Sequence, residues 1–229
     1  MVALFYGVSI VGNRQDKKEG AMDNMSFDRW RPRALSLTYR SYAHNLGQSV
    51  HPQALKIWRS QRRLLDVFGR YLPPEARLLE LGSGNGKFAD YLEAKQYQVR
   101  RTDPILEFVR YQCGQGREAE WYEVRHGVLD DHCYDGVLSM GLFQHFDDAQ
   151  CDDVLQNVHR MLRPWGMLLV RVPIGYGAGF KSYYGNGYRY IRYRTPDLLT
   201  RALEETGFIV EEMICDDHWI SCIASKYAR

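Results

Sequence analysis

Cysteine is scarce in this chain, and the cysteines present follow no recognised pattern. The 229 residues include five cysteines, an odd number, and no two of them form a C-x-x-C pair. This spacing argues against a zinc site and against a disulfide scaffold. We therefore expect no bound metal and a reducing, cytoplasmic location.

The sequence also lacks an apolar run long enough to cross a membrane. Its apolar start, residues 2–11, is shorter than the roughly 20 residues that a membrane-spanning helix needs. No basic residue precedes this run and no convincing cleavage site follows it, so a signal peptide is not expected either. Because a charged stretch and the methionines Met22 and Met25 come next, we interpret residues 1–24 as a loosely ordered N-terminal extension.

A strong charge of one sign is missing as well. The chain has 30 Lys and Arg against 28 Asp and Glu, for a net charge of +2. No separate RNA-binding module is visible, so a nucleic-acid partner is disfavoured without being excluded. The charge is unevenly distributed, because residues 26–70 hold nine Lys or Arg against two acids, whereas residues 118–153 hold ten acids against one Arg. The basic segment would attract a phosphate, a carboxylate or an RNA backbone.

Length and periodicity favour one α/β domain with a sizeable core. Hydrophobic residues make up 45% of the chain, which suits a domain of this size. Helical periodicity covers residues 55–72, 87–95 and 148–162, and strand-like segments cover residues 77–81, 97–102, 121–125, 136–139, 167–172, 209–214 and 219–224. Alternation of strands and helices predicts a mainly parallel sheet. The last two strands have only a short link, which predicts an antiparallel hairpin.

The most informative segment is the apolar strand that ends in Glu80 and runs into Gly82, Gly84 and Gly86. Glycine takes positive φ values and lets a ligand approach the backbone closely. The amphipathic stretch that follows would present a helix N-terminus to that ligand. About 20 residues later a second strand ends in Asp103, at the spacing where α/β nucleoside sites place a ribose-binding acid.

The spacing of the glycines separates three ligand classes. A dinucleotide site needs G-x-G-x-x-G, and Lys87 occupies the position of the last glycine. A P-loop needs a glycine where Leu81 stands and a hydroxyl where Phe88 stands. Neither alternative fits. The pattern acid-x-G-x-G-x-G with a later acid resembles motif I of the class I S-adenosylmethionine-dependent methyltransferases.

Three later segments resemble the same family in the same order. Residues 134–140 look like the fourth strand of the family. Residues 160–170 look like its L-x-P-G-G turn, with Trp165 in place of the first glycine. Residues 194–199 resemble the late helix start that is common in the small-molecule branch. The resemblance covers about residues 75–225. It implies a Rossmann-like, seven-stranded, mainly parallel sheet with helices on both faces and a C-terminal antiparallel hairpin. Residues 25–229 would form a single methyltransferase domain, in which residues 25–74 are a helical cap.

The resemblance implies S-adenosylmethionine as cofactor and S-adenosylhomocysteine as product. Glu80 would orient the loop or, through water, the cofactor's ammonium group. Asp103 would accept both ribose hydroxyls, with a helix N-cap ahead of Pro104 as its alternative. The adenine contact is least defined: His126 and Gly127 are favoured, with Asp130 and Asp131 as rivals. The expected cofactor-binding residues are Glu80, Gly82, Ser83, Gly84, Asn85, Gly86, Asp103, Pro104, His126, Gly127, Ser139, Met140 and Tyr39.

The methyl acceptor is expected under residues 174–194, a segment too long for a plain connection. It holds six tyrosines, five glycines and four basic residues, and no acid. Aromatic faces with cations suit a planar or sugar-like acceptor that carries negative charge, which makes this segment a predicted substrate lid. A basic surface hairpin is the alternative. The expected substrate-binding residues are Tyr42, Tyr176, Tyr183, Tyr184, Tyr188 and Arg189.

His145 follows the fourth predicted strand and is the candidate catalytic residue. An imidazole titrates near neutrality and can remove a proton from an acceptor. The alternative is a histidine that packs against or caps the next helix, because methyl transfer depends on alignment more than on a strong base. The predicted activity is methyl transfer to an oxygen or nitrogen of a small metabolite, by a monomer or homodimer. Methylation of tRNA or of a protein side chain, and a non-catalytic cofactor-binding partner subunit, are the alternatives.

Overall fold

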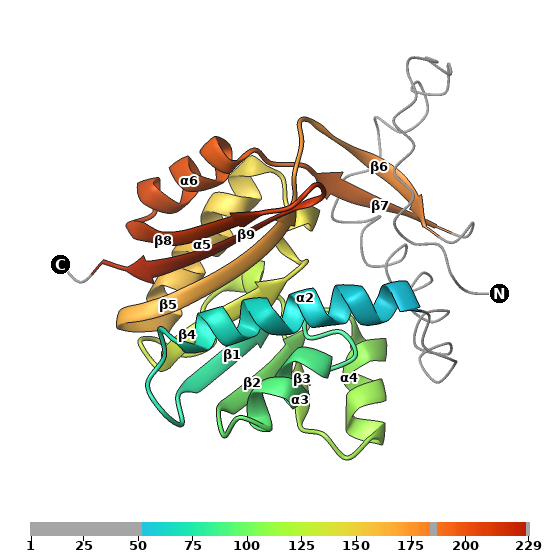
Figure 1. The fold of residues 1–229 in the computed structure, drawn as a ribbon, viewed down its shortest axis with the longest axis vertical. Helices are drawn as coiled ribbons and strands as arrows, with labels where there is room; N and C mark the ends of the chain where they lie inside the picture. Colours follow the sequence, from blue (N-terminus) through green and yellow to red (C-terminus); the bar gives the residue numbers. More distant parts are fainter. Residues whose placement is uncertain (1–51, 184–186, 228–229) are drawn as a thin grey trace.

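A seven-stranded sheet forms the centre of the molecule (Figure 1). The computed structural model describes residues 52–183 and 187–227, and for residues 52–56 and 181–189 only the course of the backbone. The strands lie in the order β3-β2-β1-β4-β5-β9-β8. Their bounds are β1 Arg77–Leu81, β2 Gln98–Asp103, β3 Ala119–Trp121, β4 Tyr134–Met140, β5 Leu162–Pro173, β8 Phe208–Cys215 and β9 Trp219–Lys226. Only β9 runs antiparallel to its neighbours β5 and β8, which confirms the predicted sheet and C-terminal hairpin.

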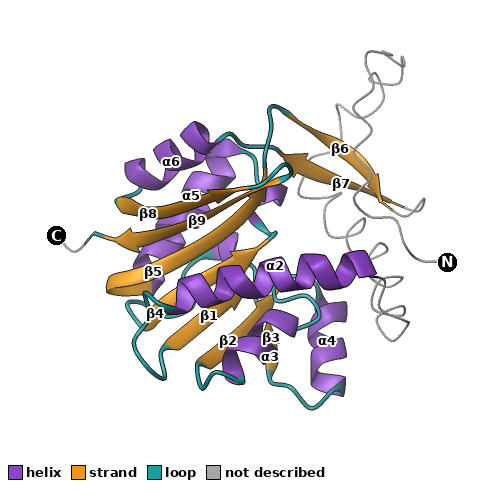
Figure 2. Cartoon of the chain, viewed as in Figure 1, coloured by secondary structure: helices purple, strands orange, loops and turns teal. Residues whose placement is uncertain are grey.

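Helices cover both faces of the sheet (Figure 2). They are α2 Pro52–Gly69, α3 Lys87–Glu93, α4 Leu106–Gly114, α5 Asp148–Met161 and α6 Pro196–Glu205. α5 begins with a capping box, in which Asp147 accepts from the backbone N–H of Gln150 at 2.8 Å. α6 begins at a proline preceded by Thr195, whose side chain accepts from Leu198. The predicted helix over 55–72 is present, but it starts at Pro52 and ends at Gly69.

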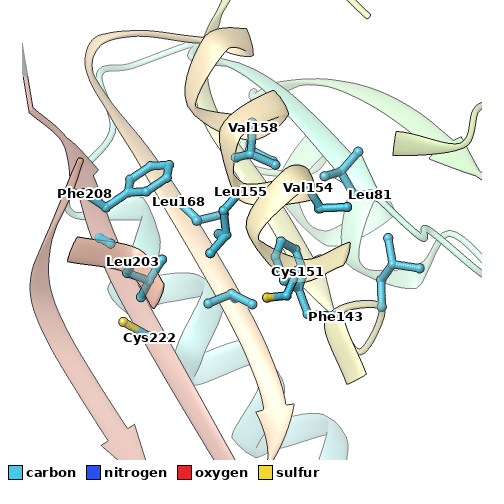
Figure 3. Packing of buried hydrophobic residues seen from close by; sticks show 14 of the residues in the cluster. Leu81, Phe143, Cys151, Val154, Leu155, Val158, Leu168, Leu203, Phe208 and Cys222 are labelled. Atoms are coloured by element: carbon cyan, nitrogen blue, oxygen red, sulfur yellow. The ribbon is translucent and has the colours of Figure 1, made fainter. Parts of the chain in front are cut away.

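Successive residues of the central strands point to two separate apolar layers. On one side Leu78 and Leu138 pack with Phe68 of α2. On the other side the core includes Val154, Leu155 and Val158 of α5 with Leu168 of β5, as Figure 3 shows. Strands buried on both faces are typical of parallel sheets between helices. Because a slip of one residue would exchange the two layers, this burial fixes the register and aligns the carboxyl ends of β1, β2 and β4.

Residues 174–183 and 187–194 form a hairpin that stands apart from the main sheet (Figure 1). Its strands are β6 Ala178–Tyr183 and β7 Gly187–Arg192, which pair antiparallel. The Phe180 and Tyr190 rings meet edge to face, with centroids 5.7 Å apart. At the root of the hairpin Gly175 donates its N–H to the Arg194 carbonyl at 3.0 Å. The hairpin therefore extends from the carboxyl end of β5.

The predicted strand over residues 121–125 is wrong. β3 ends at Trp121, whose register partner is Asp103, the last residue of β2. Beyond that point no strand is left to pair with, and Val124–His126 forms a 3-10 helix whose N-terminus is capped by Glu123. Tyr122 and Val124 both pack in the α5-side core. The alternation of apolar residues at these two positions therefore comes from core packing and not from a strand.

Trp165 occupies the turn where the resemblance expects a glycine. Its φ is 63°, in the left-handed region, and its side chain is 61% exposed. The backbone thus adopts the conformation that favours glycine, and the indole packs edge to face on Tyr227 at 6.0 Å. Trp165 lies near the start of β5, at the sheet end remote from β6 and β7.

The expectations for residues 1–24, and for the part of the cap before Pro52, lie outside the described residues. Helix α2 is the portion of that cap seen here. Within 52–183 and 187–227, no helix combines the length and the apolar character needed to cross a bilayer.

Candidate active site

The glycine turn after β1 has left-handed backbone at all three predicted glycines. Gly82, Gly84 and Gly86 have φ values of 74°, 55° and 80°. A side chain at position 82 would lie 3.2 Å from the Leu142 Cβ, and one at position 86 would lie 2.5 Å from the Gln112 Oε1. At position 84 nothing among the described residues lies within 4 Å. Gly84 is therefore the glycine that faces open space, where a ligand can approach the backbone.

Gln112 of α4 and Arg101 of β2 hold this turn. Gln112 is fully buried and donates to the Ser83 Oγ at 2.8 Å and to the Gly84 carbonyl at 2.9 Å. Arg101 is 3% exposed and donates to the Gly86 carbonyl at 3.4 Å and to Asp90 of α3 at 2.9 Å. Neither residue was predicted, because neither lies in the glycine motif. Their contacts make the turn preorganised rather than loose.

Asp103 joins the end of β2 to the glycine turn. One carboxylate oxygen accepts the N–H of Gly84 at 2.8 Å and the other accepts the N–H of Ile105 at 2.8 Å. Ile105, not Asp103, is the N-cap of α4. Burial raises the pKa of Asp103 to about 7, and the neighbouring Glu123 carboxylate adds to the rise. Its position beside Gly84 suits the predicted ribose contact, which stays a prediction.

Glu80 is a buried carboxyl group without a hydrogen-bond partner among the described residues. Its side chain is 0% exposed, and burial raises its pKa to about 8, against the opposing field of Arg101. An unpaired buried carboxylate is costly. An ammonium group, or water held by one, would supply the missing donors, and S-adenosylmethionine carries such a group. The site residues thus fit the implied cofactor.

Two further polar atoms near the end of β4 share this property. The Ser139 Oγ and the Gln144 Oε1 are buried and have no hydrogen-bond partner in the described part of the chain. Ser139 was predicted as a cofactor contact and Gln144 was not. Buried polar atoms are normally satisfied, so each of these atoms marks a place that a polar ligand can complete.

Lys87 and Arg171 add positive charge on the same side of the sheet as Glu80. The Lys87 Nζ donates to the Gln61 Oε1 at 2.9 Å. Burial lowers the pKa of Lys87 to about 8, with a further contribution from Arg171, whereas Glu80 opposes the shift. Arg171 lies near the end of β5 and stacks over Trp219 at 4.5 Å. Neither cation was among the predicted site residues.

His145 lies in a 3-10 helix, Phe143–His145, that follows β4. Its side chain is 5% exposed, and its Nδ1 lies 2.8 Å from the Tyr190 carbonyl oxygen on β7. Three residues earlier, Leu142 packs beside Gly82. The segment from Leu142 to His145 therefore links the glycine turn to the hairpin. Since Asp147 caps α5, the alternative of a capping histidine does not hold.

The adenine contact is the weakest part of the predicted site. His126 is exposed, and Gly127 follows it with a φ of 139°. Glu123 is 8% exposed and lies close enough to Asp103 to affect its pKa. A signal for Glu123 was present, since Glu80, Asp103 and Glu123 are acids at or just beyond the ends of three neighbouring strands.

The other predicted residues are placed as follows. Asn85 accepts the N–H of Lys87 at 3.3 Å, Met140 ends β4, and Pro104 follows Asp103. Tyr176 is 87% exposed at the root of the hairpin. Three predicted residues, Tyr184, Tyr39 and Tyr42, lie outside the described residues. For three others only the backbone is described: Tyr183, Tyr188 and Arg189. In the described ranges no group of three His, Cys, Asp or Glu could hold a metal.

Comparisons with known proteins agree with this geometry. A family model described as a methyltransferase domain matches residues 28–213. No curated protein matches the chain. Among solved structures, a S-adenosylmethionine-dependent methyltransferase of Methanosarcina mazei is 17% identical, with a TM-score of 0.65 over 71% of this chain and 98% of the other.

Two further structures have the same fold. The Burkholderia thailandensis 1,6-didemethyltoxoflavin-N1-methyltransferase, solved with 1,6-didemethyltoxoflavin and S-adenosylhomocysteine, is 17% identical, with a TM-score of 0.63 over 86% of this chain and 91% of the other. A TehB-like methyltransferase of Corynebacterium glutamicum is 19% identical, with a TM-score of 0.60 over 85% and 99%. The family match, the sheet order and the glycine turn lead to one conclusion: this chain belongs to the class I S-adenosylmethionine-dependent methyltransferases.

Proposed function

We propose that the enzyme transfers the sulfonium methyl group to an oxygen or nitrogen atom of a small, anionic or sugar-like metabolite. The observation that carries this proposal is the hairpin of residues 174–194, whose β7 is bonded to the buried His145 beside the glycine turn. This arrangement puts a proton acceptor and an aromatic, basic segment at the same edge of the sheet. A small acceptor fits under such a hairpin as under a lid.

The charges of the site support an acceptor with negative charge. Lys87 and Arg171 lie on the side of the sheet that Glu80 occupies. A cation near a carboxylate or phosphate of the acceptor would orient it without taking part in the chemistry. The N-methyltransferase from Burkholderia thailandensis, whose structure contains a small acceptor, supports the size class by analogy of fold alone.

Cofactor residues would act by positioning. S-adenosylmethionine supplies an activated methyl group. Asp103 and Gly84 would hold the ribose end, and Glu80 the ammonium end, so that the methyl group faces the end of β4. His145 would then take up the acceptor's proton, which is the role we assign to it.

The test uses the full chain with cofactor labelled on its methyl group. The enzyme and the labelled cofactor are incubated separately with three fractions of one cell extract. These fractions are the metabolites below about 1 kDa, the purified tRNA and the protein. We expect the label in the metabolite fraction, at a mass shifted by one methyl group. Label in tRNA or protein, with none in metabolites, would overturn the proposal in favour of a macromolecular acceptor. Gly84→Val, which fills the open approach to the turn, is the inactive control.

A further inference from the structure

Every second residue from Tyr190 to Arg194 contacts the segment that carries His145. The Tyr190 carbonyl meets the His145 Nδ1 at 2.8 Å. Arg192 pairs with Asp148 through two hydrogen bonds of 2.9 and 2.7 Å. These contacts join two segments that lie more than 40 residues apart in the sequence, and they fasten the hairpin to the turn after β4.

Arg194 makes the most buried of these contacts. Its guanidinium donates to the Phe143 carbonyl at 3.1 Å and to the Phe146 carbonyl at 3.2 Å. The side chain is 3% exposed. Two carbonyls on either side of His145 are thus held by one planar group, whose fork geometry a lysine cannot reproduce. The 3-10 turn is fixed against the root of the hairpin.

The contact with Tyr190 also decides which ring nitrogen of His145 carries the proton. A backbone carbonyl oxygen can only accept a hydrogen bond. In the neutral imidazole, Nδ1 therefore carries the hydrogen and Nε2 carries the lone pair. A proton accepted at Nε2 leaves the Nδ1–H bond to Tyr190 in place, and the carbonyl then stabilises the cationic ring.

We propose that β7 is a positioning element for His145: the Tyr190 carbonyl sets its tautomer, and Arg192 and Arg194 are positioning residues that hold its turn. This inference rests on the proposed function, because it needs an acceptor that loses a proton. In the reaction, the acceptor's lone pair forms the bond to the methyl carbon and the sulfur keeps the electron pair of the broken C–S bond. The acceptor's proton goes to the His145 Nε2, which is a buried nitrogen.

The first experiment needs no acceptor. Long-range ¹H–¹⁵N correlation spectra of the full chain report the tautomer of each of its seven histidines, and His145→Gln identifies the His145 signals. We expect the Nδ1–H tautomer in the wild type and a mixture of tautomers in Arg192→Gln and Arg194→Gln. Arg160→Gln, which removes an exposed pair with Asp131, is the matched control and should keep the wild-type spectrum. An Nε2–H tautomer in the wild type, or Arg variants that match the wild type, would overturn the inference.

The second experiment separates positioning from general damage to the fold. With a methyl acceptor in hand, Arg192→Gln should lower kcat by about tenfold and leave cofactor affinity unchanged. The exchange Arg192→Asp with Asp148→Arg should restore at least half of the wild-type kcat. A loss of kcat that the exchange does not restore would overturn the role of this pair. If the spectra are as expected and no small molecule is methylated, the proposed function fails while the tautomer assignment stands.

Discussion

Gly84 donates its backbone N–H to the Asp103 carboxylate at 2.8 Å, and so joins the turn after β1 to the end of β2. The bond places Gly84, which alone among the three glycines of the turn faces open space in the described part of the chain, beside the acid that ends β2. A ligand with a ribose would meet both at once. The same carboxylate also accepts from Ile105, so its removal should loosen the turn and lower cofactor affinity together.

Asp103→Ala should weaken binding of S-adenosylmethionine by about 1.5–3 kcal/mol, the usual worth of hydrogen bonds to a charged group. Isothermal titration calorimetry measures the loss. Glu204→Ala, which removes an exposed acid on α6, is the control and should bind normally. Wild-type affinity in a folded Asp103→Ala protein would contradict the ribose role.

Cofactor affinity should depend on pH through Glu80. Burial raises the pKa of this carboxyl to about 8, so it is mostly protonated at pH 6.5. The ionised form is the one that attracts an ammonium group, and binding must therefore release a proton. Affinity should rise from pH 6 to pH 7.5, by at most about tenfold per pH unit for one proton.

Calorimetry in buffers of different ionisation enthalpy measures the released protons. Glu80→Gln should reduce the release and flatten the pH dependence, leaving the smaller contribution of Asp103, whose pKa is also raised by burial. The exposed Glu204→Gln should behave as the wild type. Proton release that is unchanged in Glu80→Gln would show that this acid does not sense the cofactor.

Substitutions at Gly84 and Gly86 should separate binding from stability. Both positions have positive φ, so alanine costs roughly 1–2 kcal/mol of backbone strain at each. At position 86 the new methyl group also meets Gln112 and Arg101. We expect Gly86→Ala to have the lower melting temperature and Gly84→Ala to lose more cofactor affinity. The reverse order would mean that the open face of Gly84 is not the ligand's approach.

The glycine turn and Asp103 could be predicted from the sequence because both depend on local spacing. The positive φ values of the three glycines confirm that part of the prediction. The strand at 121–125 failed since strand length is set by the partner: β2 ends at Asp103, and β3 ends opposite it at Trp121. Local alternation of apolar residues carries no information about where a neighbouring strand stops.

The contacts of His145 could not be predicted. Its partner on β7 is a backbone carbonyl, which every residue has, so no residue type marks it. No sequence pattern marks Gln112 either, because its amide reaches the glycine turn from α4, 28 residues away in the chain. Such contacts appear only once the packing of the sheet brings distant segments together.

His145→Ala should lower kcat by about 10², the typical contribution of a general base, and leave cofactor affinity unchanged. The pH profile of kcat should lose its acid-side inflection. His159→Ala is a suitable control, because His159 packs on Phe208 in the α5–β8 core. A mild effect of His145→Ala would mean that alignment alone drives transfer.

Removal of residues 183–193 should abolish acceptor turnover and leave cofactor binding within about threefold of wild type. The deletion removes Tyr190 and Arg192, whereas Glu80, the glycine turn and Asp103 remain. Normal acceptor kinetics in the shortened protein would show that the hairpin is not a substrate lid.

The most direct test of the account is a crystal structure of the full chain with S-adenosylhomocysteine and a methyl acceptor. The account predicts ribose hydroxyls within hydrogen-bond distance of Asp103, the ammonium group on the Glu80 side, and the acceptor atom between the sulfur and the His145 Nε2 under the hairpin. A nucleoside bound away from Asp103, or an acceptor atom that approaches the sulfur from a side remote from His145 and β7, would contradict it.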